Sequence, residues 1–438
     1  MHVLSWCIIN GVRLTLSLAK TLNRFYLCRD RVNRQYTDVL ISNHKETPMF
    51  TTQRSKPIST LVMTNLPLVA ALAVSFNASA AESYKLRQAP VGTFGGDIAT
   101  PADKPGFFGT ASLTQLTIEG IKGPDGGGLT KASPLNSTPL RLVDAAFVGT
   151  PLANVQATVG PGSVSLTQEQ TQINIAAGYL TETTFANGRI ALVANVPLIK
   201  QSRTLLLSYP DTTFSPNIVP ANYAAMVNTA VRTAASNASN TATGDAVGLG
   251  DTELSAVWVR HVDRIKVAAG VSVFVPTGKY DVARDVLTQA NPGFGNFYTI
   301  RPGVAFTYNL NPNYSHQDWD AGVTIAGRFA YGFNTENKDS KYKSGNYIYA
   351  EGAVVKVMGD TAIGFNLFST QQITDDSYSG TDLTKTINGR YKTMGGGPFF
   401  SYKIPGQDMG LNFQINRNFS GRNAIDVTSY QLRLIKAF

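Results

Sequence analysis

The chain has few of the residues on which soluble folds and cysteine-based sites depend. Charged residues make up only 15% of its 438 residues, against about 25% in an average soluble protein. Its cysteines are limited to Cys7 and Cys28. Beyond residue 80 the sequence has no run of about 18 apolar residues free of charges and strong helix breakers, which disfavours a helical membrane protein.

An export signal stands at an unusual distance from the first residue. Residues 61–76 (LVMTNLPLVAALAVSF) form a short apolar stretch. Arg54 and Lys56 precede this stretch, and a small-x-small cleavage pattern follows it at residues 78–80. We therefore expect residues 49–80 to be a signal peptide.

The position of this signal determines how the preceding residues are interpreted. Met49 is the natural start of translation, and Met63 is an alternative. Residues 1–48 are then an over-extended start, expected to be disordered. The other interpretation is a real cytoplasmic extension anchored by residues 4–18, a stretch that Arg13 interrupts.

The exported part of the chain is close to neutral. The whole sequence has 38 basic and 29 acidic residues, whereas residues 81–438 have 29 and 26. Because most of the positive excess is removed with the signal, we expect no nucleic-acid partner. Both cysteines are removed as well, so disulfides and thiolate metal sites are not expected.

From residue 106 onward, apolar and polar residues alternate with a period of two, the pattern of strands with one apolar face. In residues 265–275, for example, Ile265, Val267 and Val271 share a face. We expect twelve such strands, at 107–121, 173–179, 190–198, 254–262, 265–275, 298–308, 319–331, 347–358, 361–368, 390–403, 411–419 and 426–438.

Three features distinguish this pattern from that of a soluble β-sandwich. The face opposite the apolar one is small and polar, aromatic residues lie near strand ends, and short turns mostly alternate with longer loops. An open edge in lipid would leave backbone amides unpaired. We therefore predict an all-β fold, an antiparallel transmembrane β-barrel of about twelve strands over residues 106–438. A periplasmic lead-in is expected at residues 81–105.

Two long segments interrupt the pattern. Residues 122–170 are rich in Gly, Pro and Thr, and we expect a loop with some extended structure near residues 141–148. If this segment contains another hairpin, the barrel has fourteen strands. Residues 201–248 form an insert whose Ala-rich middle, residues 222–238, is either a short helix or a flexible polar loop.

The last strand resembles the carboxyl-terminal signal of bacterial outer-membrane barrels. The terminal Phe438 is preceded at alternate positions by Leu434, Leu432 and Tyr430, and only Lys436 departs from the pattern. We expect these residues to be recognised by the barrel-assembly machinery and this strand to close the barrel against residues 107–121.

A set of motifs resembles the outer-membrane proteins of the phenol meta-pathway (MetA-pathway) degradation family. They are GLGD at 248–251, PTGKYD at 276–281, NTENKDSKYKSG at 334–345, QITDDS at 372–377 and GGGPFFSY at 395–402. The resemblance covers about the last 190 residues. It implies a β-barrel in the cell outer membrane of a Gram-negative bacterium, often encoded beside genes for the degradation of aromatic or hydrophobic compounds.

Catalysis has little support in the sequence. Beyond residue 80 the chain has two histidines, His261 and His316, and both fall at connections on the predicted periplasmic side. Neither has a nearby serine motif that would supply a nucleophile. We therefore expect no enzyme activity and no cofactor.

Acidic residues cluster on predicted external loops, at residues 375–376 with Asp382 and at Glu336 with Asp339. Solvated loop carboxylates are the simpler interpretation, and we expect no metal site. Calcium binding, or bridging to divalent ions of the lipopolysaccharide leaflet, is the alternative.

Charged residues on the inward faces mark the predicted path of a solute. If the apolar faces contact lipid, the inward set is Lys266, Arg301, Asp320, Arg328 and Arg433. A basic lumen would favour anionic solutes such as aromatic carboxylates. In the alternative interpretation these charges pair with Asp320 or Glu351 and fill a narrow barrel.

From these observations we expect an outer-membrane channel for passive uptake of small aromatic or hydrophobic solutes, with residues 201–248 or 122–170 forming a constriction. The alternative is a structural or binding barrel with a filled lumen. Lipid, lipopolysaccharide and the assembly machinery are the other expected partners.

Overall fold

The computed structural model describes residues 86–87, 105–281, 291–311, 322–381 and 389–438. The expected over-extended start and signal peptide, residues 1–80, lie outside the described residues. So does the lead-in, apart from residues 86, 87 and 105. The compact unit described below belongs to residues 64–438.

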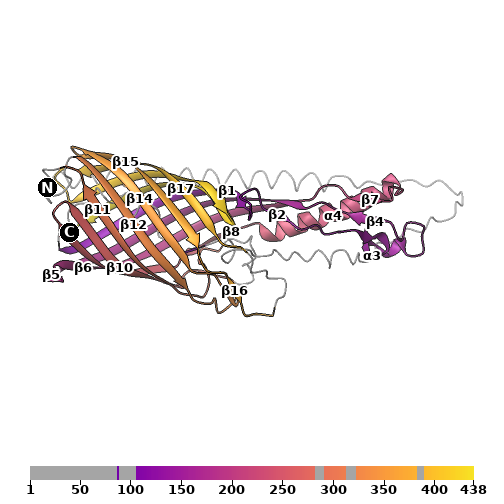
Figure 1. Cartoon of the computed structure of the whole chain (residues 1–438), viewed down its shortest axis with the longest axis horizontal. Helices are drawn as coiled ribbons and strands as arrows, with labels where there is room; N and C mark the ends of the chain where they lie inside the picture. Colours follow the sequence, from indigo (N-terminus) through magenta and orange to yellow (C-terminus); the bar gives the residue numbers. More distant parts are fainter. Residues whose placement is uncertain (1–85, 88–104, 282–290, 312–321, 382–388) are drawn as a thin grey trace, which may run out of the picture. The chain divides into compact units, whose positions relative to one another are not determined.

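Twelve antiparallel strands form a closed barrel (Figure 1). They are β1 (Gly106–Lys122), β5 (Gly162–Phe185), β6 (Gly188–Ser208), β9 (Thr252–Val262), β10 (Ile265–Val275), β11 (Thr299–Asn309), β12 (Gly322–Asn334), β14 (Tyr347–Met358), β15 (Thr361–Gln372), β17 (Lys392–Ile404), β18 (Met409–Arg422) and β19 (Ala424–Ala437). The predicted fold class and strand number are confirmed, and the fourteen-strand alternative is wrong.

The barrel closes where the terminal strand pairs with the first one. The β1–β19 register runs from Phe108 opposite Ala437 to Lys122 opposite Ala424, and the Phe438 amide donates to the Phe107 carbonyl at 2.9 Å. The side chains of Tyr430, Leu432 and Phe438 are exposed on the outer face, while Leu434 is half-buried. The Lys436 ammonium lies 5.4 Å from the centre of the Phe438 ring, which offsets its departure from the apolar pattern. Recognition by the assembly machinery stays a prediction.

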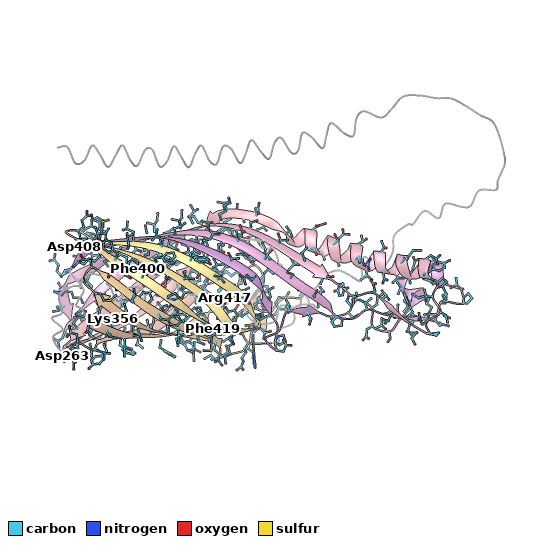
Figure 2. The ribbon with its side chains drawn as sticks, turned by 90° about the horizontal axis from the view of Figure 1, so that it is seen from above. Asp263, Lys356, Phe400, Asp408, Arg417 and Phe419 are labelled. Atoms are coloured by element: carbon cyan, nitrogen blue, oxygen red, sulfur yellow. The ribbon has the colours of Figure 1, made fainter. Side chains whose placement is uncertain are left out.

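Short turns gather at the end of the barrel that holds the carboxyl terminus. Ala186 and Asn187 connect β5 to β6, both with positive φ, as a tight two-residue hairpin requires. Asp263 and Asp408 lie in turns at this same end, whereas Arg417 and Phe419 lie towards the opposite end (Figure 2). Since short turns face the periplasm in outer-membrane barrels, the opposite end is the external one.

Beyond the external end of β1, strands β5 and β6 continue as a paired ribbon that we call the extension (Figure 1). Its other elements are β2 (Thr130–Lys131), β3 (Thr138–Pro139), α3 (Leu140–Val143), η3 (Ala145–Phe147), β4 (Gln156–Thr158), β7 (Thr213–Ser215), α4 (Ala221–Ala242) and β8 (Gly244–Leu249). The extended structure expected at residues 141–148 is therefore wrong, because two short helices occupy this segment.

The extension has an apolar core of its own. Val227, Val231 and Ala235 form the buried stripe of α4 at helical spacing, and they belong to the same buried cluster as Leu166 and Leu205 of the ribbon. The Ala-rich stretch is thus a helix packed on a sheet. No helix in the described part of the chain is both long and apolar enough to cross a bilayer.

Candidate functional site

Two of the predicted lumen arginines form buried ion pairs with acids on other strands, Arg328 with the neighbouring strand β14 and Arg301 across β10 with β9. Arg301 lies 2.7 Å from Glu253, and Arg328 lies 3.0 Å from Glu351. Arg301 also lies over the Phe274 ring at 5.0 Å. These pairs correspond to the alternative in which inward charges neutralise one another.

The other predicted residues of the path are spread around the barrel. Arg433 is buried and donates to the Gln431 side chain at 2.6 Å, while Lys266 is half-buried on β10 opposite His261. Asp320 lies outside the described residues. The four described residues of this set do not all meet at one place, and the role of the set in a solute path stays a prediction.

A cavity of about 290 Å³ lies inside the barrel towards the external end. Its lining combines neutral polar side chains of β1, β5, β6, β18 and β19 with the buried apolar or aromatic side chains of Leu86, Phe368 and Tyr391 and with Phe294. None of the four predicted lumen cations lines this cavity. It is the candidate functional site.

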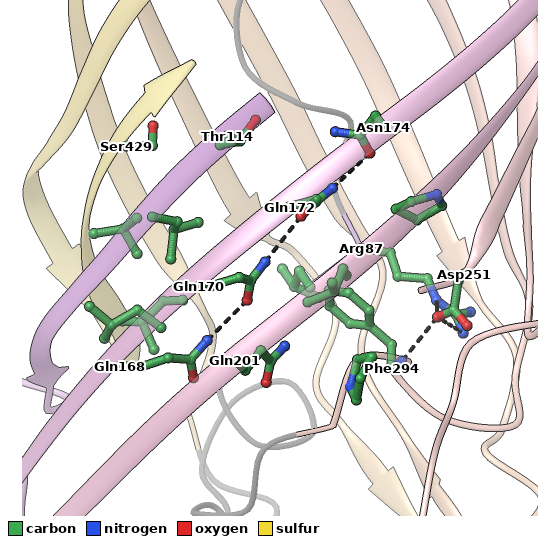
Figure 3. A pocket seen from close by; sticks show the side chains of 18 of the residues that line it. Arg87, Thr114, Gln168, Gln170, Gln172, Asn174, Gln201, Asp251, Phe294 and Ser429 are labelled. Atoms are coloured by element: carbon green, nitrogen blue, oxygen red, sulfur yellow. Dashed lines mark hydrogen bonds and ion pairs between the residues drawn. The ribbon is translucent and has the colours of Figure 1, made fainter. Parts of the chain in front are cut away.

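One side of the cavity is a continuous row of side-chain amides on β5, which we call the carboxamide ladder (Figure 3). Its members are Gln168, Gln170, Gln172 and Asn174. Each donates to the next, at 3.0, 3.0 and 2.8 Å, and Asn174 donates to the Ser112 hydroxyl at 3.2 Å. Alternate residues of a strand share a face, so the ladder follows directly from the spacing of these residues.

The external end of the cavity is occupied by Leu86 and Arg87. Arg87 is 2% exposed, forms an ion pair with Asp251 at 2.7 Å and donates to the carbonyls of Phe297 and Gly295. The Arg87 guanidinium also lies 3.8 Å from the centre of the Phe297 ring, and its backbone carbonyl accepts a hydrogen bond from the Tyr347 hydroxyl. Residues far away in the sequence thus hold this segment inside the barrel.

Asp251 joins two of the motifs that carry the family resemblance. Its carboxylate accepts hydrogen bonds from the backbone amides of Gly278 and Phe294, both at 3.0 Å, in addition to the Arg87 contact. A Cβ atom at Gly278 would lie 2.6 Å from Gly293 and 2.7 Å from Asp251. Only glycine fits this close approach, so GLGD and PTGKYD form one structural unit at the external rim.

The acidic loop residues have structural partners. Asp375 forms a bidentate contact with Arg390, whose hydrogen bond lowers the pKa of the Asp375 carboxyl. Asp376 is 4% exposed and accepts hydrogen bonds from Tyr342, Gln372 and the Gly345 amide. Within the described ranges no group of three or more His, Cys, Asp or Glu side chains could hold a metal ion. Asp382 and His316 lie outside those ranges.

The sequence reasoning missed the ladder and the Arg87 site. The ladder had a visible signal, because glutamine occupies positions 168, 170 and 172 with the period of a strand. Asp251 was present in a motif but was given no role. Leu86 and Arg87 carried no local signal, since the Arg87 partners are more than 150 residues away.

The closed barrel, its apolar outer face and its polar, charge-paired interior define a porin-like outer-membrane β-barrel protein. The sequence profile of the family described as "Putative MetA-pathway of phenol degradation" matches residues 154–434. Since this match covers well over half of the chain, the chain belongs to that family, as the motifs predicted. None of the curated proteins compared with the chain matches it.

Solved structures with similar strand arrangements are distant in sequence. The COG4313 outer membrane channel from Pseudomonas putida F1 is 12% identical, with a TM-score of 0.49, covering 80% of this chain and 100% of that one. The Pseudomonas putida toluene transporter TodX is 10% identical, with a TM-score of 0.30, covering 82% and 95%. At these identities the likeness concerns the fold alone.

Proposed function

We propose that the protein is a passive channel that carries small aromatic or hydrophobic compounds across the outer membrane through its lumen. The observation that carries this proposal is the cavity inside the barrel, because it pairs an aromatic wall with a neutral polar wall. Ligand sites are typically concave, mostly apolar and provided with a few placed polar groups. Membership of a family described by phenol degradation agrees with an aromatic solute.

Residues 122–170 and 201–248 were expected to form a constriction, but their cavity-lining residues belong to the wall of the barrel. Gln168 and Gln170 lie on β5, and Gln201 and Arg203 lie on β6, so residues 122–170 and 201–248 contribute wall strands. Among the described residues, Leu86 and Arg87 narrow the external end of the cavity. In this proposal the Arg87–Asp251 pair controls how far the lumen is open.

The second candidate function is that of a structural or binding barrel, which has a filled lumen and does not carry a solute across the membrane. It is favoured by the filled external end, where Arg87 is buried and held by Asp251, Phe297 and Gly295. Three buried ion pairs, counting those of Arg301 and Arg328, also cross-link the described part of the lumen.

Conductance in planar bilayers distinguishes the two candidates. We expect the purified protein to conduct, and Asp251→Ala to raise the conductance at least about twofold, because the variant leaves Arg87 buried without its counter-charge, a loss of about 3–5 kcal/mol. Asp211→Ala is the matched control, since it breaks an exposed ion pair with Arg232 in the extension. A protein that stays silent, with or without Asp251, supports the filled barrel instead.

A further inference from the structure

We propose that the outer face of the barrel has a binding site for the phosphate groups of lipopolysaccharide, and that Lys392 of β17 and Arg422 of β18 are its central residues. The site lies outside the lumen and does not depend on transport through the barrel. It differs from the expectation of divalent-ion bridging at the acidic loops, because the described carboxylates of those loops already have protein partners.

Lys392 and Arg422 are cross-strand neighbours at the external end of the β17–β18 pair. They lie directly opposite each other in the register, and both side chains are exposed. The next residues of β17 show which face this is, because Thr393 lines the lumen cavity whereas Met394 is 40% exposed. Alternate residues of a strand share a face, and opposite residues of a pair lie on the same side of the sheet. Lys392 and Arg422 therefore both lie on the outer face.

Two cations in these positions repel each other. The Cβ atoms of directly opposite residues are only about 4.5–5.5 Å apart, so like charges there destabilise the strand pair. Within the described part of the chain, neither the Lys392 nor the Arg422 side chain forms an ion pair or a hydrogen bond. An anion bound between the two cations would turn this repulsion into two attractive contacts.

The acids near the pair are bound to other groups. Two ion pairs lie on the adjoining strands: Arg417 with Glu119 at 3.5 Å, and Lys122 with Asp426 at 3.3 Å. Asp125, in the turn that follows β1, accepts a hydrogen bond from the Gly127 amide at 2.9 Å. Lys392 and Arg422 therefore keep their charge for an anion from outside the protein.

An apolar surface beside the pair indicates a lipid rather than a free anion. Met394 is the next outward residue of β17, and Phe419 of β18 is 61% exposed. The apolar face continues towards the periplasmic end with exposed Phe400 and Phe413, and Phe419 lies nearer the external end than Phe400 (Figure 2). Lipid A, the membrane anchor of lipopolysaccharide, carries phosphates directly above its acyl chains. A pair of cations at the external edge of an apolar band matches that order.

The two side chains also suit a phosphate group by their chemistry. A guanidinium donates two parallel N–H bonds to two oxygens of one phosphate, and an ammonium adds a compact charge with three donors. Both side chains are long, so their charged ends can reach the headgroup level while their stems stay against the apolar surface.

Titration of the purified full-length protein in detergent, followed by native mass spectrometry, tests the site. The probes are lipid A with two phosphates, the same lipid without phosphates, and inorganic phosphate. We expect the phosphorylated lipid to bind at least about tenfold more tightly than the dephosphorylated one, because two cations contribute to its binding. Equal binding of the two lipids overturns the proposal. Inorganic phosphate that binds as tightly as lipid A overturns the assignment to a lipid.

Substitutions then test the two named residues. Lys392→Gln and Arg422→Gln should each weaken binding of phosphorylated lipid A about fivefold, the effect of one cation at an anionic membrane surface. Lys200→Gln is the matched control and should stay within about twofold. Lys200 is also exposed on the outer face, but its register neighbours on β5 and β8, Thr171 and Val247, are uncharged. Unchanged binding in both test variants overturns the assignment.

Thermal unfolding without lipid A distinguishes a binding role from a structural one. Each test variant should then unfold at the same temperature as the unaltered protein or at a higher one, because the repulsion within the pair is removed. A lower unfolding temperature in both variants contradicts the proposal.

Conductance of the same preparations separates this site from the proposed function. A silent protein that prefers phosphorylated lipid A contradicts transport alone. A conducting protein without that preference contradicts the lipid site alone.

Discussion

The barrel and the extension share two strands but distribute their residues in opposite ways. Within the barrel, the outer face of β5 carries exposed Ile173 and Ile175, and the inner face carries the carboxamide ladder. Past residue 168 towards the external end, the outer face carries Ser163, Ser165 and Thr167, and the inner face carries Val164 and Leu166.

Strand β6 makes the same change. Its outer face passes from exposed Val196 and Leu198 to exposed Lys200 and Ser202, while Leu205 on the inner face is fully buried in the apolar core. On both strands the exposed outer face becomes mainly polar near residues 168–172 and 199–201, with Leu206 as the exception, and this indicates that the medium outside the sheet changes there from lipid to water. The inside changes there from a polar lumen to a packed core.

Among the substitutions that compare the two regions on their shared strands, the largest loss of stability should come from the core of the extension. Leu205→Ala removes a fully buried side chain and should lower the free energy of unfolding of the extension by about 2–5 kcal/mol. Protease cleavage of the extension, followed with increasing urea, measures this loss. Leu198→Ala is the control on the same strand, because Leu198 is 46% exposed on the outer face. Equal loss of barrel and extension would show that the two regions unfold as one.

A charged residue introduced on the outer face of β5 should lower the stability of the barrel slightly less, by an amount that depends on whether the position faces lipid or water. Ile175→Lys places an ammonium against lipid and should cost about 2–4 kcal/mol near the bilayer centre. Thr167→Lys lies on the same face in the aqueous part and should cost almost nothing. Unfolding of the reconstituted barrel in urea measures both. A similar cost for the two variants would mean that the change of medium has been placed wrongly.

The stability of the extension should also depend on pH, and this effect should be the smallest of the three. Burial lowers the pKa of Lys131 from 10.5 to about 8, so the unfolded chain binds more protons between these values and stability should rise as pH increases. Burial raises the pKa of Tyr209 from 10.0, which opposes the gain above that pH because the unfolded tyrosine ionises first. We expect a rise in urea resistance between about pH 8 and 10, absent in Lys131→Met. A flat profile in the unaltered protein would contradict it.

Much of the barrel could be predicted because each membrane strand carries its own signal. The strand ending in Phe438 and its pairing with residues 107–121 were predicted and are confirmed. The expected start of the second strand at residue 173 was eleven residues too late, since β5 begins at Gly162. A strand is recognisable in the sequence by its apolar outer face, and the part of β5 near residues 163–167 has a polar outer face.

The candidate site was predicted less well. Arg301, Arg328 and Arg433 point inward as expected. The ion pairs of Arg301 with Glu253 and of Arg328 with Glu351 depend on how the strands are arranged in the closed barrel, whereas the hydrogen bond from Arg433 to Gln431 lies within β19. The amides at 168, 170 and 172 are visible in the sequence, yet their meaning requires knowledge of which side of the sheet encloses the lumen.

The alternation, the number of strands and the closing strand could be deduced from the sequence without a structure, because a period of two and short turns are local properties of the chain. Two features required the folded barrel: the meeting of Arg87 with Asp251, and the aromatic wall that lines the same cavity as the amides of β5. These contacts join residues far apart in sequence. They exist only once the sheet has closed and placed its inner face around a common space.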